Sequence, residues 1–153
     1  MYPNPYVNEV KNAVGRSKVD VYFAKALMRQ ESIFDDQIKS QAGAIGLMQI
    51  MPYTGEALAL QERVPDFDKK MLRNPLMAIR LGIRYLKDLW NDFGDPRWVL
   101  ANYNAGPGPA KRWKKWGKGK EYEIQVEDVS YWETRDYIKK VMGNYWVYKA
   151  LYQ

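Results

Sequence analysis

The sequence contains neither cysteine nor histidine. Without cysteine it has no disulfide and no thiol nucleophile, although this absence leaves the redox compartment open. Without histidine it has no Ser-His-Asp triad, and without either residue it has no zinc–water site built on imidazole or thiolate ligands. Acid–base chemistry therefore falls to carboxylates, lysine and tyrosine. We expect neither a metal nor a cofactor.

Long hydrophobic runs are also absent. No apolar segment approaches the roughly 20 residues of a membrane-spanning helix. The first residues, Met1 to Pro5, lack the charged-then-apolar pattern of a signal peptide. Either the protein is not exported or its signal is not part of this chain. With 153 residues and no repeat or linker pattern, residues 1–153 are predicted to form one domain.

Hydrophobic periodicity and helix-boundary residues predict a mostly α fold. The sequence predicts helices over about 6–14, 19–31, 52–60, 75–93, 96–104, 111–116 and 132–151, a loop over 61–73 and an extended segment over 121–129. Ser17 and Asp20 resemble a capping box for the second helix. Phe23, Leu27 and Glu31 are spaced by four and share one face of that helix, so Glu31 should point the same way as the core.

Glu31 is therefore the first candidate for a catalytic acid or base. It could end its helix in a surface ion pair with Arg29 or Lys39. Alternatively, the unfavourable helix dipole and partial burial would raise its pKa and keep it protonated near neutral pH, as a general acid requires. A turn of small residues, 42–46, and a lone amide, Gln49, follow in the chain. This arrangement is more typical of a cleft than of a core.

Three blocks of sequence resemble the signature of the soluble lytic transglycosylases, which cleave bacterial peptidoglycan. The first comprises QES at 30–32 and SQAGAIGLMQIMPYT at 40–54, the second is ANYNAGP at 101–107, and the third is WETRDY at 132–137. They follow one another in the order found in that family. The resemblance implies a lysozyme-like single domain with a substrate groove.

The resemblance also implies a role for each matching position. Glu31 would be the sole catalytic acid and base. Ser40, Gln49, Met51, Tyr103 and Glu133 would bind substrate: Ser40 at the sugar beside the scissile bond, Gln49 at an acetamido group, Met51 along the groove. Tyr103 would position Glu31 and the substrate, and Glu133 would bind the glycan or organise the site. The chain departs from the family at Asp35-Asp36, where Asn-Pro or a close variant is usual.

The chemistry of a single acid agrees with this resemblance. A hydrolytic glycosidase needs a second carboxylate, and only Asp35 and Asp36 are near Glu31 in sequence. They follow the predicted helix end in a polar link and should face water. With one acid, the 6-hydroxyl of MurNAc could attack intramolecularly and form a 1,6-anhydro ring, helped by proximity. A hydrolytic muramidase of the same fold, assisted by Asp35 or Asp36, remains an alternative.

The net charge of +6 favours polyanionic partners, and residues 111–120 concentrate lysines around Trp113 and Trp116. We expect both indoles to pack inward. A catalytically idle module that binds glycan or nucleic acid is a further alternative, although the intact Glu31 argues against it. We expect peptidoglycan glycan strands as the partner, no nucleic acid, a monomeric state, and a periplasmic or extracellular location.

Overall fold

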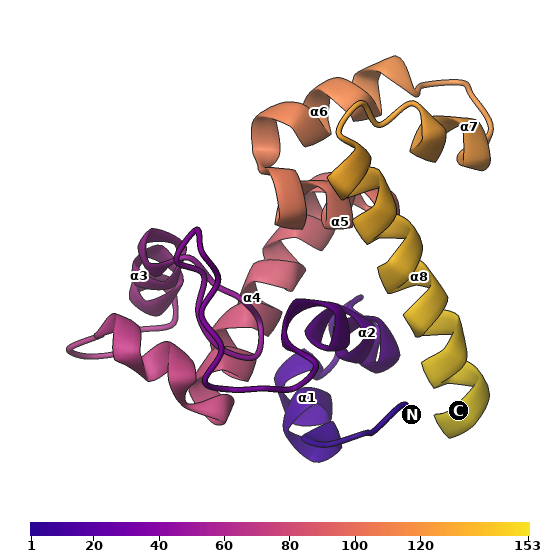
Figure 1. Ribbon diagram of the computed structural model, residues 1–153. Helices are drawn as coiled ribbons and strands as arrows, with labels where there is room; N and C mark the ends of the chain where they lie inside the picture. Colours follow the sequence, from indigo (N-terminus) through magenta and orange to yellow (C-terminus); the bar gives the residue numbers. More distant parts are fainter.

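The computed structural model describes residues 1–153 as a mostly α single domain (Figure 1). The elements are α1 (Val7–Val14), α2 (Val21–Ser32), α3 (Pro52–Gln61), the 3-10 helix η1 (Lys69–Arg73), α4 (Pro75–Phe93), α5 (Pro96–Ala105), α6 (Pro107–Trp116), α7 (Tyr122–Glu127) and α8 (Trp132–Tyr152). The helices α6 and α7 lie at one end of the molecule, beyond α5, and α8 runs from that end to the chain termini.

Helix α2 forms the centre of the core. Its segment from Phe23 to Met28 is buried on every side, including Lys25. Phe23 meets Trp90 of α4 and Tyr145 of α8 edge to face, with ring centroids 5.2 and 6.0 Å apart. Such aromatic pairs stabilise a core beyond the area that they bury. The first turn of α2 is thus held between two long helices.

Both ends of α2 are fixed by side-chain hydrogen bonds. Asp20 caps the start by accepting from the backbone N–H groups of Tyr22 and Phe23 at 2.7 and 3.2 Å. The predicted capping box was therefore wrong, because Asp20 is itself the N-cap. At the other end, the Ser32 hydroxyl contacts the carbonyls of Met28 and Leu47 at 3.1 and 3.0 Å. It ties the helix end to the loop that follows.

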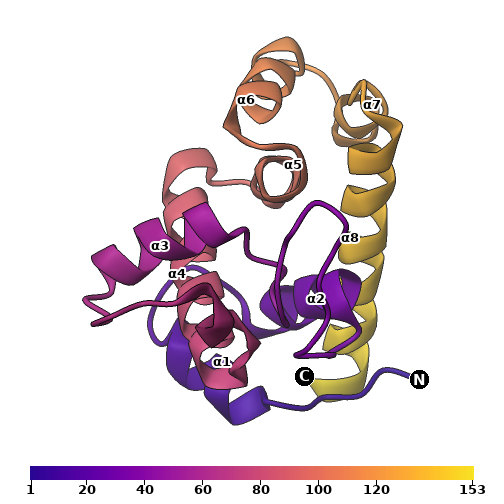
Figure 2. The same ribbon diagram turned by 60° about the vertical axis from the view of Figure 1, so that its left-hand side comes forward.

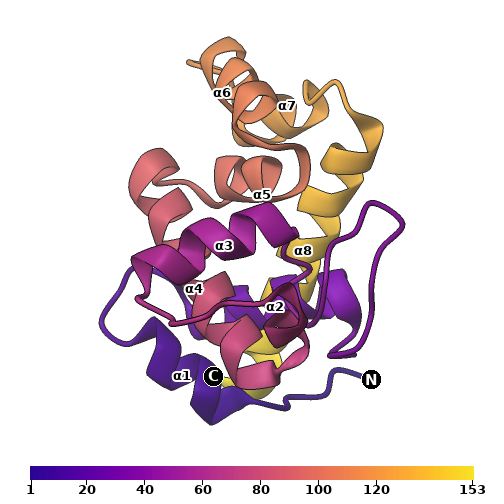
Figure 3. The ribbon, with the colours of Figure 1, turned by 90° about the vertical axis from the view of Figure 1, so that its left-hand side faces the viewer.

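The loop from residue 33 to residue 51 folds back on itself between α2 and α3 (Figures 2 and 3). Isolated bridges pair Ile45 with Lys39 and with Ile50. Gly46 has φ +75°, and a Cβ there would lie 2.1 Å from the carbonyl oxygen of Leu72. Only glycine fits both this backbone conformation and this close approach. The small-residue turn thus presses the loop against η1.

The predicted starts of three helices at proline are confirmed. Helices α3, α4 and α5 begin at Pro52, Pro75 and Pro96, and the side chains of Asn74 and Asp95 cap the last two. These caps satisfy backbone N–H groups that lack intrahelical partners.

Three other predictions needed correction. Helix α6 begins at Pro107, not at Lys111, because proline fits the first turn and Gly106 makes the junction with α5. Residues 122–127 are helical, not extended: Val126 and Val129, three apart, are both buried, whereas Ile124 is exposed. The predicted loop over 61–73 ends in η1.

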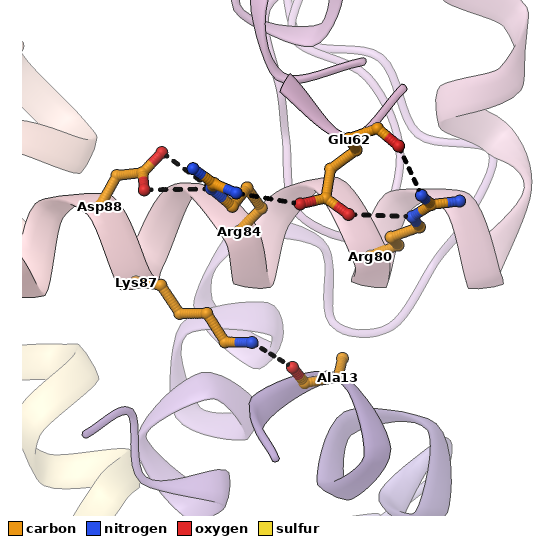
Figure 4. Close-up of polar contacts among 6 residues, drawn as sticks. All are labelled: Ala13, Glu62, Arg80, Arg84, Lys87 and Asp88. Carbon is orange, nitrogen blue, oxygen red and sulfur yellow. Dashed lines mark hydrogen bonds and ion pairs between the residues drawn. The ribbon is translucent and has the colours of Figure 1, made fainter. Parts of the chain in front are cut away.

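A chain of ion pairs joins the end of α3 to the outer face of α4 (Figure 4). Glu62 accepts from Arg80 and Arg84 at 3.1 and 3.3 Å, and Arg84 also pairs with Asp88 at 3.1 Å. On the same helix, Lys87 donates to the carbonyl oxygen of Ala13 at 2.7 Å and so fastens α1. This network braces α4 from the side opposite its buried face.

The two ends of the chain meet beside α8. The Tyr148 and Tyr152 hydroxyls donate to the carbonyls of Pro3 and Tyr2, each at 2.6 Å. The buried Lys25 ammonium donates to the carbonyl of Pro5, and burial lowers its pKa to about 8 against the opposing effect of Glu9. None of the helices is both long and apolar enough to span a bilayer.

Candidate active site

Glu31 is the penultimate residue of α2 and is partly buried. Its carboxylate accepts a hydrogen bond from the Tyr137 hydroxyl, with 2.5 Å between the oxygens. Burial raises the pKa of Glu31 from 4.5 to about 7, and the Tyr137 hydrogen bond opposes that shift because it favours the charged form. Glu31 can therefore release and regain a proton near neutral pH.

Two tyrosines, Tyr137 buried and Tyr103 partly buried, accompany this carboxyl group. Tyr137 lies on α8, and Tyr103 lies on α5, where its hydroxyl donates to the carbonyl oxygen of Met48 at 2.7 Å. Burial, followed by the charge of Glu31, raises the pKa of both phenols well above the ordinary value. Both therefore stay neutral and act as hydrogen-bond donors. The direct partner of Glu31 is Tyr137, whereas Tyr103 anchors the loop beside it.

A hollow of about 320 Å³ opens between the loop, α3 and the end of α5. Its lining residues are Gln49, Ile50, Met51, Tyr53, Thr54, Tyr85, Asn102, Tyr103, Asn104, Ala105, Gly106 and Pro107. None of them is acidic. Glu31 is not itself in the lining and lies close to Tyr103, whose pKa it raises. Amides and aromatic rings in one concave surface suit an uncharged sugar ligand.

Gln49 enters this hollow in an unusual backbone conformation. Its φ is +46°, which few non-glycine residues adopt. Its Nε2 donates to the carbonyls of Gly46 at 2.9 Å and Ile38 at 3.3 Å. These bonds fix the amide and leave Oε1 to accept from a ligand. An N–H of an acetamido group is a suitable donor, and the strain is typical of a functional position.

Tyr85 supports the wall of the hollow from α4. Its hydroxyl accepts from the Asn102 side chain at 3.0 Å, and its ring lies 5.2 Å from that of Tyr103. Asn102 is buried, so this hydrogen bond satisfies a polar group that would otherwise be costly. Tyr103 is therefore held by its ring and by its hydroxyl.

Glu133 lines a second hollow, of about 480 Å³, which meets the first at Asn104 and Ala105. One residue later, Thr134 donates to the Asn104 side chain at 2.7 Å. Glu133 and Tyr137 are four residues apart on α8 and share one face. Glu133 is exposed. The structure thus places a second carboxylate beside the hollow, about one helical turn from the residue that holds Glu31.

Ser40 and the two aspartates lie in the loop outside both hollows. The Ser40 hydroxyl accepts from the backbone N–H of Ala44 at 3.0 Å and shapes the turn. Asp35 accepts from the backbone N–H of Gln37 and Asp36 from its side chain, both at 2.9 Å. Neither aspartate lines a hollow. The structure brings Gln49, Met51 and Tyr103 together, places Glu133 next to them, and leaves Ser40 in a turn.

Sequence reasoning missed Tyr137 and Tyr85 as site residues. Tyr137 ends the third sequence block, and that position was the available signal; nothing local marked Tyr85. No group of three or more acidic side chains is placed to hold a metal ion.

A known protein family and solved structures match this chain in sequence and fold. A family model described as the transglycosylase SLT domain matches residues 8–126. The chain belongs to this family. It is 33% identical over 155 residues to the soluble lytic murein transglycosylase of Escherichia coli strain K12, covering 99% of this chain and 23% of that protein. The chain thus spans about a quarter of the length of that relative.

Solved structures share the fold. The 70 kDa soluble lytic transglycosylase of Escherichia coli superposes with a TM-score of 0.92 at 32% identity, over 98% of this chain and 25% of that one. The lytic transglycosylase Slt of Pseudomonas aeruginosa, solved as an inactive glutamate-to-glutamine variant, gives 0.92 at 28% identity over the same shares. The predicted mostly α, lysozyme-like fold is confirmed.

Proposed function

We propose that this SLT domain is a peptidoglycan lytic transglycosylase that cleaves the MurNAc–GlcNAc β-1,4 bond. The observation that carries the proposal is a single carboxyl group, Glu31, whose pKa is about 7 and which a buried phenol holds beside a hollow with no acidic lining residue. Family membership supports the same activity. We further propose that residues 1–153 form the catalytic unit.

The reaction needs one proton donor that becomes the acceptor. Glu31 gives its proton to the glycosidic oxygen while the bond from that oxygen to C1 of MurNAc breaks. The acetamido group stabilises the cationic centre. The 6-hydroxyl oxygen then attacks C1, and its proton passes to Glu31, which is restored. No water is consumed, and the attack is favoured because the nucleophile is tethered.

The other site residues bind and position the sugar. Oε1 of Gln49 accepts from the acetamido N–H, Met51 and Tyr85 provide apolar walls, and Glu133 binds glycan hydroxyls in the second hollow. Tyr137 stabilises the Glu31 carboxylate that exists between the two proton transfers. Ser40 shapes the loop through its hydrogen bond to the backbone N–H of Ala44. The substrate implies a periplasmic or extracellular site of action, and we propose that the domain acts as a monomer.

Mass spectrometry of digested, purified cell walls tests the proposal. The main products should end in 1,6-anhydroMurNAc, one water lighter than hydrolysis products and without a reducing end. A digest that contains mainly reducing MurNAc ends would assign the domain to the muramidases. Binding without any release of muropeptides would make it a glycan-binding module.

A further inference from the structure

The whole net charge of the protein lies in one segment. Residues 107–120 contain six lysines and arginines and no acidic residue, which leaves eighteen basic and eighteen acidic residues in the rest of the chain. Most of these six charges belong to α6 and the turn after it. The positive charge of the molecule is therefore local and not a property of its whole surface.

Four of these lysines converge on a third hollow, of about 480 Å³. Its lining residues are Trp98, Lys111, Lys114, Lys115, Lys118 and Gln125. The lysines follow the spacing i, i+3, i+4, i+7, so they share one face at and beyond the end of α6. All four are exposed, and none forms an ion pair. No acidic side chain lines this hollow.

Two neighbouring acids and one guanidinium are engaged in other contacts. Glu127 pairs with Lys139 and Arg135, and Asp128 pairs with Lys120. Arg97 pairs with Asp95 and donates to Oε1 of Gln125 at 2.8 Å, which fixes that amide at the edge of the hollow. Lys114 donates to the carbonyl oxygen of Phe93 at 3.1 Å, but none of the four lysine charges is paired with an acid.

Stability of the helix does not account for this arrangement. The dipole of α6 favours Lys114 and Lys115 near its end but not Lys111 in its middle. Like charges three and four residues apart repel one another. Like charges at i, i+4 on α4 and α8 are balanced by a shared acid: Arg80 and Arg84 both pair with Glu62, and Arg135 and Lys139 both pair with Glu127. The four lysines around the third hollow share no such acid, and a cluster of like charges without a counter-ion is typical of a binding site.

The lining of the third hollow suits an anion that does not need aromatic stacking. Trp98, the one aromatic residue in the lining, is only 4% exposed and forms a floor, so it cannot stack on a nucleic-acid base. Trp116 is 57% exposed but lies outside the lining, which corrects the expectation that both indoles pack inward; Trp113 is buried. Amines around a fixed amide suit carboxylates.

Helix α6 connects this surface to the substrate hollow. Gly106 and Pro107, at its start, line the hollow beside Tyr103. Lys115 follows Pro107 by eight residues, or about 12 Å of helical rise. A polymer bound at Tyr103 can therefore extend to the lysines. Peptidoglycan carries carboxylates on its peptide stems at regular intervals along the glycan.

We propose that Lys111, Lys114, Lys115 and Lys118 form an accessory site for the carboxylates of peptidoglycan stem peptides. The site retains the domain on its polymer next to the point of cleavage. This proposal rests on the proposed function for its choice of ligand. It deepens that function by assigning a second substrate-binding surface outside the catalytic hollow.

Sedimentation with purified cell walls measures binding and so tests the accessory site. Every protein in this experiment carries Glu31→Gln so that the polymer stays intact. A variant with all four lysines changed to Gln should bind at least about tenfold more weakly at low salt. The matched control changes Lys11, Lys18, Lys69 and Lys70 to Gln; these are also exposed and form no ion pair. It should lose much less binding, and both variants should keep the melting temperature of the parent.

Walls whose carboxylates have been amidated test whether carboxylates are the ligand. They should bind the parent protein as weakly as untreated walls bind the four-lysine variant. Equal losses in the two lysine variants would overturn the site. If the parent binds amidated walls as well as untreated ones, the carboxylates are not the ligand. The same conclusion follows if a single-stranded oligonucleotide binds more tightly than the walls do and its binding depends on the same lysines. Product analysis of the active enzyme tests the catalytic proposal separately.

Discussion

The Tyr137 hydroxyl donates to the Glu31 carboxylate at 2.5 Å across 106 residues of sequence. This bond joins the last helix to the end of α2. It closes a ring of contacts in which Tyr103 reaches Met48 and Thr134 reaches Asn104. The three sequence blocks thus bind one another around a single titratable group. The pKa of Glu31 therefore depends on the contacts that hold the three blocks together.

Tyr137→Phe should raise the pKa of Glu31 further, because the lost hydrogen bond favours the carboxylate. Activity that needs protonated Glu31 falls above a pH of about 7 in the parent. In the variant this basic limb should move upward by about one pH unit. The maximal rate should drop, since the carboxylate must form between the two proton transfers.

The control for that experiment is Tyr103→Phe, which removes a hydroxyl bonded to Met48 and not to Glu31. Its pH profile should keep the parental basic limb even if the rate falls. Equal displacement of the limb in both variants would show that burial, and not the Tyr137 bond, sets the response.

Glu31→Gln should abolish turnover and make the fold more stable above neutral pH. The folded-state pKa of Glu31 is raised from 4.5 to about 7, so its contribution to the free energy of unfolding is lost as pH rises through that window. A shift of this size corresponds to up to about 3 kcal/mol. Urea denaturation at pH 5 and pH 8 measures it. A stability difference that does not grow between the two pH values would contradict the burial of the charge.

Much of the fold could be predicted from the sequence because its signals are local. Asn74-Pro75 and Asp95-Pro96 mark helix starts, and the spacing of Phe23, Leu27 and Glu31 placed the acid on the core side. The segment 122–127 was predicted wrongly because its helix is only six residues long and its burial depends on α8. The Tyr137 contact could not be derived from spacing, since only tertiary packing brings α8 to α2.

Asp35→Asn and Asp36→Asn should each leave the rate within about twofold of the parent and the products unchanged. Both carboxylates bond to Gln37 and lie outside the two hollows, so neither is placed to activate water at the sugar. Initial rates and mass spectrometry of the products check this. Loss of activity in either variant, together with reducing ends in the parental digest, would favour the muramidase mechanism.

Glu133→Gln should weaken substrate binding more than it changes the chemistry. The side chain is exposed in the second hollow, where an amide retains the shape and an acceptor oxygen but loses the charge. We expect KM to rise several-fold, because a hydrogen bond to a neutral amide is weaker than one to a carboxylate by about 1 kcal/mol, while the products keep their anhydro ends. A change from anhydro to reducing ends, or a rate as low as that of Glu31→Gln, would instead make Glu133 a second catalytic carboxylate.

Gly82→Ala should displace the loop that carries Met48 and so lower both stability and activity. Gly82 lies in α4, and a Cβ there would be 2.6 Å from Cγ and 2.8 Å from Cβ of the buried Met48. Those atoms are close to the backbone whose carbonyl holds Tyr103, so relief of the clash must displace the loop. Such overpacking costs about 1–3 kcal/mol, and the rate should fall with it.

Gly143→Ala in α8 is the matched control: no atom lies within 4 Å of its Cβ, and alanine should stabilise the helix by up to about 1 kcal/mol. The melting temperature should therefore fall in Gly82→Ala and rise in Gly143→Ala. The rate of wall digestion should fall in Gly82→Ala and stay at the parental value in Gly143→Ala. If Gly82→Ala melts like the parent and digests walls at the parental rate, Met48 does not control the position of Tyr103.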